Sequence, residues 1–223
     1  MSEQEPTERT PPQEPERIPL QGDDAKVRRK RTLSGLIAVA LLGAAFGGVA
    51  GLIGGKVAGL VVAAVIALPL LLLVLSTARR RMWLEGTTVT VRTWGSRRVD
   101  LSTASRIDLL VTDVRGTRTV GLLVTGAQGG GAVKIDLAMY AGTGGRELGI
   151  LPLRKLADAV VNNMEAGGVV FSQLLVAQLR AEARGDAAAE RPLYRLASAA
   201  PSGKLAQRFS MAAVSRFVAT LDD

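Results

Sequence analysis

Two long apolar segments without any charge dominate the first third of the chain. Leu33–Gly54 and Val57–Ala78 each run for 22 residues without Asp, Glu, Lys or Arg. A helix of that length reaches about 33 Å, whereas the hydrocarbon core of a bilayer is about 30 Å thick. A signal peptide fits the first segment poorly, because some thirty residues, acidic at their start, precede it. We therefore expect two transmembrane helices, over residues 33–54 and 57–78.

Glycines recur at every fourth position across these segments, at Gly43, Gly47, Gly51, Gly55 and Gly59. Helices in a bilayer associate through close backbone packing, and small residues four apart leave a groove for a neighbouring helix. We expect Gly43, Gly47 and Gly51 to line such a groove, and Gly55 and Gly59 to serve the short turn. Two alternatives stay open: the spacing can arise by chance in a chain rich in Gly and Ala, and the groove can receive either the second helix or another subunit, giving a homo-oligomer.

The charge of the chain is concentrated beside the apolar segments. The net charge of +8 and the pI of about 10.6 would usually suggest nucleic-acid binding, but residues 82–165 and 166–223 are each only +2. The excess lies in two runs, which we expect at the membrane surface in contact with anionic lipid: Lys26, Arg28, Arg29, Lys30, Arg31, and Arg79, Arg80, Arg81. By the positive-inside rule, both termini are expected in the cytoplasm, which makes a multi-pass protein of the plasma (inner) membrane. No nucleic-acid partner is expected.

The first 25 residues differ in composition from the rest of the chain. They hold seven acids, two bases and five of the nine prolines, without an aromatic residue. Burying the few apolar side chains of this segment cannot offset the entropy lost on ordering it. We therefore expect residues 1–25 to form a disordered acidic tail.

After Arg81 the pattern changes to the alternation of apolar and polar residues that is typical of strands. The stretches are residues 87–94, 97–101, 119–125 and 132–139, with the following side chains expected on the inner face: Val89, Val91, Val99, Leu101, Val120, Leu122, Val124, Val133, Ile135 and Leu137. Leu153–Met164 follows as an amphipathic helix. Trp83 fits either an interfacial anchor or a core position. We expect an α+β domain over residues 82–165.

Residues 166–223 are expected to form a helical extension with two helices. The first carries Phe171, Leu174, Leu175 and Leu179 on one side, and the second covers Lys204–Thr220 with Phe209 and Phe217 on one face. The apolar face of this second helix could pack against the domain, or the helix could lie on the membrane surface.

The order of these features resembles that of actinobacterial membrane proteins with a bacterial pleckstrin-homology-like (PH-like) domain. The resemblance rests on the basic lead, the two-helix hairpin and the stretch MWLEGTTVTVRTWGSRRVDLSTASRIDLL, and it covers residues 34–165. One departure is Leu101, where a tryptophan is often found before the Ile107 position. The resemblance implies a strongly bent, seven-stranded sheet capped by a C-terminal helix. It implies interaction or association with the membrane surface, and it does not imply phosphoinositide binding.

The chain has no histidine and no cysteine, which excludes Ser-His-Asp triads, cysteine nucleophiles and the common zinc sites. Its glycine-rich stretches, GAQGGGAV and GTGGRELG, lack the residues of phosphate-binding and dinucleotide-binding loops. We therefore expect no catalytic residue, cofactor or metal. Two functions remain: a non-enzymatic, membrane-anchored cytoplasmic interaction or scaffold module that recruits a protein, or an accessory or regulatory subunit of a transport or channel complex.

Overall fold

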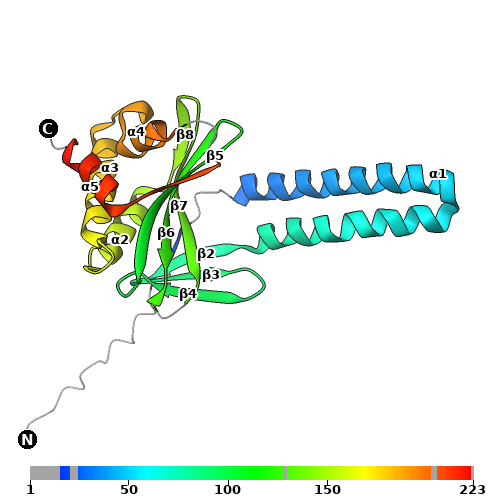
Figure 1. Ribbon diagram of the computed structural model, residues 1–223, viewed down its shortest axis with the longest axis horizontal. Helices are drawn as coiled ribbons and strands as arrows, with labels where there is room; N and C mark the ends of the chain where they lie inside the picture. The colour runs from blue at the N-terminus through cyan, green and yellow to red at the C-terminus, as the bar shows by residue number, and fades with distance from the viewer. Residues whose placement is uncertain (1–15, 21–24, 128–129, 202–204, 222–223) are drawn as a thin grey trace, which may run out of the picture.

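The computed structural model describes residues 16–20, 25–127, 130–201 and 205–221. A long apolar helix near the N-terminus, α1 (Ala25–Arg79), projects from a domain made of two antiparallel sheets and several helices (Figure 1). Within the described residues, α1 is the one helix that is long and apolar enough to cross a membrane, as judged by length and composition.

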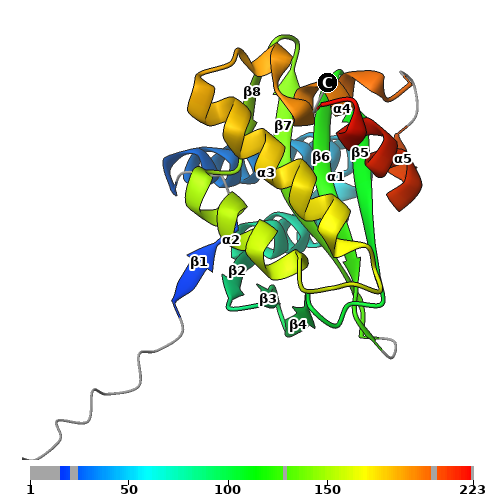
Figure 2. The same cartoon turned by 90° about the vertical axis from the view of Figure 1, so that its left-hand side faces the viewer.

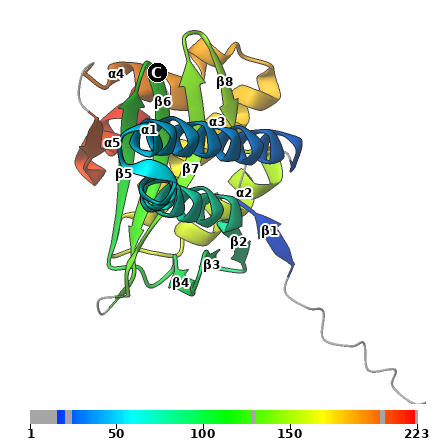
Figure 3. The ribbon, with the colours of Figure 1, turned by 90° about the vertical axis from the view of Figure 1, so that its right-hand side faces the viewer.

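The helix α1 is interrupted at Gly55. This residue has φ 82° and ψ 171°, a backbone conformation that glycine adopts readily and that other residues avoid. We call residues 25–54 the first arm and residues 56–79 the second arm. The arms lie side by side (Figures 1 and 3), and their backbones approach each other closely at Gly47 and Gly59. Residues that are far apart along α1 are therefore in contact.

The smaller sheet has the strand order β1-β2-β3-β4, all antiparallel. Its strands are β1 (Arg17–Pro19), β2 (Arg81–Glu85), β3 (Thr88–Arg92) and β4 (Ser96–Asp100). The strand β1 pairs with β2, so that Ile18 lies opposite Leu84, and both Ile18 and Leu20 are buried. The expectation of a disordered segment over residues 1–25 is therefore wrong for this stretch, because two apolar side chains and a neighbouring strand edge order it. Residues 1–15 and 21–24 lie outside the described residues.

The larger sheet has the strand order β8-β7-β6-β5-β9. Four of its strands are consecutive: β5 (Arg106–Val114), β6 (Thr117–Thr125), β7 (Ala132–Ala141) and β8 (Gly144–Glu147). The fifth, β9 (Ala206–Phe209), comes from near the end of the chain and pairs with β5. The alternation read from the sequence is confirmed here, because Val120, Leu122 and Val124 are fully buried.

Four helices cover one face of the larger sheet (Figure 2), and α1 leaves the domain from the opposite side (Figure 1). They are α2 (Ile150–Val160), α3 (Gly168–Arg184), α4 (Pro192–Ala199) and α5 (Met211–Ala219), with a short 3₁₀ turn, η2 (Ala188–Glu190), before α4. The expected amphipathic helix is present as α2, but it ends at Val160, so Met164 lies beyond it and is exposed.

One hydrophobic core joins the two sheets and the four helices. Leu84 of β2, Leu122 of β6, Phe171 of α3, Leu193 of α4 and Val214 of α5 all belong to the same buried cluster. The predicted boundary at residue 165 is therefore wrong, since residues 166–223 contribute helices to this core and a strand to the larger sheet. Sequence periodicity alone did not reveal that these helices share a core with the sheets.

The helix expected over Lys204–Thr220 is also wrong in its first part. Residues 206–209 form β9, and α5 begins only at Met211, while Lys204 lies outside the described residues. Phe209 and Phe217 are partly buried against the core, so this segment packs on the domain. The unpaired edge of β5 explains the difference, because a neighbouring strand overrides the weak helical preference of four residues.

The single bent sheet that the resemblance implied is not what forms. Seven strands, β2 to β8, do precede a helix, but they divide between the two sheets, and β1 and β9 extend these sheets. The division falls at residues 101–105, where Asn163 stabilises the loop. Its amide nitrogen donates hydrogen bonds to the carbonyl oxygens of Leu101 (2.9 Å) and Ala104 (2.8 Å), and its amide oxygen accepts one from Ala166 N.

Candidate membrane-facing surface

The outer surface of α1 is apolar and largely exposed, most of all near the turn. Leu52 and Ile53 are 90% and 86% exposed, and Val57 is 77% exposed. The span Thr32–Arg79 has a mean hydropathy of 3.0 over its most apolar window, of which only 6% is buried. A soluble protein rarely leaves such a continuous apolar patch in water. The surface is therefore suited to a lipid environment.

The two arms touch through the glycine positions. A Cβ atom built on Gly47 would lie 2.7 Å from Ala63 Cβ and 2.8 Å from the carbonyl oxygen of Gly59. At Gly43 and Gly51 the nearest distances are 3.4 Å and 3.6 Å, which are ordinary contacts. Of the three glycines predicted to line a groove, all face the second arm, but only Gly47 lies where a larger side chain has no room.

Gly59 is the packing residue that sequence analysis assigned to the turn instead. Its own Cβ would lie 2.6 Å from Gly47 O and 2.8 Å from Gly51 Cα. Of the two glycines given to the turn, only Gly55 occupies it. The recurrence of glycine at every fourth residue from Gly43 to Gly59 did indicate a packing role for Gly59. The chain reversal at Gly55, however, places Gly59 on the second arm, opposite Gly47 of the first arm. Gly48 does not belong to the four-residue spacing, and a Cβ atom built on it would meet no neighbouring atom within 4 Å.

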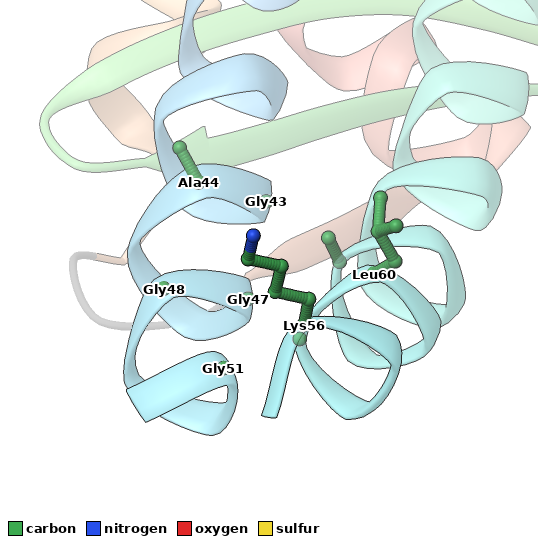
Figure 4. A pocket seen from close by; sticks show the side chains of 9 residues that line it. Gly43, Ala44, Gly47, Gly48, Gly51, Lys56 and Leu60 are labelled. Carbon is green, nitrogen blue, oxygen red and sulfur yellow. The ribbon is translucent and has the colours of Figure 1, made fainter. Parts of the chain in front are cut away.

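A shallow open pocket of about 310 Å³ lies between the arms near the turn, and its walls are almost entirely apolar. Glycines and alanines of both arms line it, together with Leu60 and Lys56. Figure 4 shows the Lys56 side chain extending from the turn toward Gly43 and Gly47. Lys56 is the one charged residue between Thr32 and Arg79. Its long stem can lie along the helices while the ammonium group reaches the nearest polar region.

Basic side chains gather where the arms meet the domain. Arg29 and Lys30 are exposed in the first turns of α1, and Arg79, Arg80 and Arg81 are exposed at its other end. Lys26, Arg28 and Arg31 belong to the same helix, but their side chains lie outside the described residues. The chain reversal at Gly55 thus brings the two basic runs, about fifty residues apart in the sequence, together on the domain side of the paired arms (Figure 1).

A cluster of polar side chains lies between the larger sheet and the start of α4. The Tyr140 hydroxyl donates to Glu147 Oε1 (2.6 Å), and Arg191 Nη1 donates to Glu147 Oε2 (2.5 Å). Burial, followed by the hydrogen bond to Glu147, raises the pKa of Tyr140 well above its ordinary value. The phenol therefore stays protonated as a hydrogen-bond donor, and the cluster holds α4 against β7 and β8.

In the described part of the chain, no group of three His, Cys, Asp or Glu side chains is placed to hold a metal ion. No protein-family model, curated protein or solved structure matches this chain. Its function must therefore be argued from the geometry of α1 and of the domain beside it.

Proposed function

We propose that the protein is a non-enzymatic interaction or scaffold module held at the cytoplasmic face of the plasma membrane. In this proposal the two arms of α1 form an antiparallel transmembrane hairpin, both chain termini are cytoplasmic, and the remaining residues form a PH-like α+β domain that recruits a protein partner. The observation that carries the proposal is the placement of both basic ends of α1 beside the domain, with exposed apolar arms between them and the far turn.

The physical argument concerns the ends of the arms. Each arm is long enough to cross the hydrocarbon core, and each presents apolar side chains around most of its circumference. Moving a basic side chain through a bilayer is unfavourable, so the domain side of the arms, which carries several arginines, stays in the cytoplasm, where the chain is synthesised. The turn carries only Lys56, so it is the end that can be translocated. Close contact at Gly47 supports pairing of the arms within the membrane, where packing replaces the hydrophobic effect.

The PH-like assignment draws on the order of the elements in the domain. Seven strands followed by the helix α2 match the order that the family resemblance implies, although they divide between two sheets. A role in binding rather than catalysis is supported by the lack of histidine and cysteine in the whole chain. Tyr140, Glu147 and Arg191 are hydrogen-bonded to one another within the domain, as expected of a structural cluster.

Single cysteines test the orientation, because the chain has none of its own. We expect Lys56→Cys, at the turn, to react with a membrane-impermeant maleimide added to intact cells. Ser198→Cys, on the exposed face of α4, should react only after the cells are permeabilised. Labelling of Ser198→Cys in intact cells would place the domain outside and reject the orientation. Extraction of the protein from membranes by alkaline carbonate would reject membrane integration altogether.

A disulfide tests the pairing of the arms in the bilayer. A Cβ on Gly35 would lie 3.8 Å from Val74 Cβ, which is the usual separation in a disulfide. We therefore expect the double variant Gly35→Cys with Val74→Cys to form an intramolecular disulfide when native membranes are oxidised. The matched control is Gly35→Cys with Leu73→Cys, because Leu73 is 63% exposed and faces away from the first arm. Equal oxidation of the two variants would contradict antiparallel pairing.

The proposed recruitment of a protein is tested by cross-linking in native membranes. A photoreactive amino acid placed at Met164, which is 78% exposed on the domain, should yield a cross-link to a different protein. A variant with the same group at Leu52 on α1 should cross-link to lipid or to a second copy of the chain. Cross-links from Met164 that contain only lipid or only this chain would contradict the scaffold function.

A further inference from the structure

The turn between β3 and β4 lies beside the Arg79 end of α1, where the second arm joins the domain. Trp94 occupies this turn, where Thr93 N donates a hydrogen bond to Gly95 O (2.9 Å), and its side chain is 62% exposed. The guanidinium carbon of Arg79 lies 5.1 Å from the centre of the Trp94 ring. Arg79 is the last residue of α1. A large aromatic ring from a different part of the chain is therefore fixed beside the point where the second arm ends.

The hairpin that carries Trp94 is strongly basic. Arg92, Arg97 and Arg98 are all exposed, and residues 86–99 contain no acid. The nearest acid before them, Glu85, forms an ion pair with Arg17 of β1. Together with the three arginines at the end of α1, the hairpin concentrates six bases between residues 79 and 98. The net charge of residues 82–165 is small, because acids elsewhere in the domain offset this local excess.

We propose that the β3–β4 hairpin is a second membrane contact, which inserts Trp94 into the headgroup region of an anionic leaflet. The inference rests on the proposed function, in that α1 must cross the same membrane. Arg79 then marks the depth at which the second arm leaves the hydrocarbon core, and Trp94, in contact with it, lies at the same depth. Tryptophan is enriched at this interface because its ring is apolar and its N–H needs a polar neighbour.

The arginines of the hairpin select the kind of lipid. Each base near an anionic surface contributes about 1 kcal/mol, so each changes the partition of the hairpin about fivefold. Figure 1 shows the β3–β4 turn pointing in the direction in which α1 leaves the domain, so the hairpin and the arms can meet one leaflet together. Two contacts, unlike one, restrict the tilt of the domain relative to the membrane plane. This orientation would present a constant face of the domain to a partner.

Depth-dependent fluorescence quenching in the full chain tests the inference. The chain has two tryptophans, so Trp83→Phe leaves Trp94 as the reporter, and Trp94→Phe leaves Trp83. Trp83 is the matched control, because it lies on β2, is partly buried and donates a hydrogen bond to Glu85 (2.9 Å). The purified variants are reconstituted in phosphatidylcholine bilayers with or without phosphatidylglycerol. A fraction of the lipid is brominated near the top of the acyl chains.

We expect bromine to quench Trp94 more strongly than Trp83, and we expect phosphatidylglycerol to increase the quenching of Trp94. The triple variant Arg92→Gln, Arg97→Gln and Arg98→Gln should reduce partition of the hairpin roughly a hundredfold and remove that increase. Circular dichroism and unchanged Trp83 emission check that the triple variant is folded.

Two results would overturn the inference while leaving the proposed function intact. The first is a Trp94 that stays accessible to aqueous iodide and is not quenched by brominated lipid in protein that resists carbonate extraction. The second is quenching that neither phosphatidylglycerol nor the triple variant alters, which would reject the anionic surface as the ligand. Protein that fails to integrate into the bilayer would instead reject the proposed function itself.

Discussion

Replacing Gly47 by Ala tests whether close packing of the two arms stabilises α1. The new Cβ would lie 2.7 Å from Ala63 Cβ and 2.8 Å from Gly59 O, whereas ordinary contacts are 3.4–4 Å. Neither neighbour is the end of a flexible side chain, so the arms must move apart. Gly48→Ala is the control, because nothing lies within 4 Å of a Cβ at that neighbouring position.

The difference between these two variants isolates the packing contribution. Both replace glycine by alanine inside the same helix, so the gain in helix propensity, about 1 kcal/mol, is common to both. Overpacking a close contact costs roughly 1–3 kcal/mol. For a chain of this size 1 kcal/mol shifts the melting temperature by roughly 2–4 °C, so Gly47→Ala should melt roughly 2–12 °C below Gly48→Ala.

The melting temperature is measured from the loss of helical circular dichroism in a mild detergent, with the oligomeric state followed by size-exclusion chromatography. A fall in stability without a change in oligomeric state assigns the contact to the two arms of one chain. Equal melting temperatures for the two variants would refute the packing argument and leave the glycine spacing as a consequence of composition.

Three further predictions concern the domain. Asn163→Ala should lower the free energy of unfolding by roughly 2–4 kcal/mol, since it leaves buried backbone groups without partners, whereas Asn162→Ala on the surface should change it by less than about 0.5 kcal/mol in denaturant titrations. Leu20→Ala, just after β1, should cost about 2–4 kcal/mol by the same measurement, and no loss would show that Leu20 contributes nothing to the core. Because the pKa of Tyr140 is raised, its contribution to stability is present below about pH 10 and is lost as the pH rises further. Tyr140→Phe should therefore flatten the fall in stability above pH 10, and an unchanged pH profile would contradict this assignment.

Local pattern was sufficient wherever one face of an element is buried. The apolar positions of residues 119–125 and 132–139 were identified from alternation alone, since successive side chains of a strand point to opposite faces. Phe171, Leu174 and Leu175 were identified from helical spacing in the same way, and all three are fully buried in α3. In each case the nearest neighbours in the sequence determine the structure.

Pairing between distant segments was beyond such patterns. The strands β1 and β9 are three and four residues long, too short for periodicity to identify, and each exists because a strand edge was available beside it. The same holds for Gly59, whose role depends on where the chain reverses at Gly55. In the sequence, Trp94 is only the last residue of a predicted strand, and its contact with Arg79 depends on how β3 and β4 are placed beside α1.

The sequence by itself determined that this chain has an apolar, uncharged segment long enough for a membrane, basic residues on both sides of it and an α+β domain after it. These properties follow from composition and short-range spacing, because the hydrophobicity and charge of a side chain do not depend on the tertiary structure around it. The tertiary structure decided which glycines touch, how the chain divides into sheets and that residues 166–223 complete the core. It also placed the Trp94 hairpin beside the basic end of α1. Those features depend on contacts between residues far apart in the sequence, which form only when the whole core is assembled.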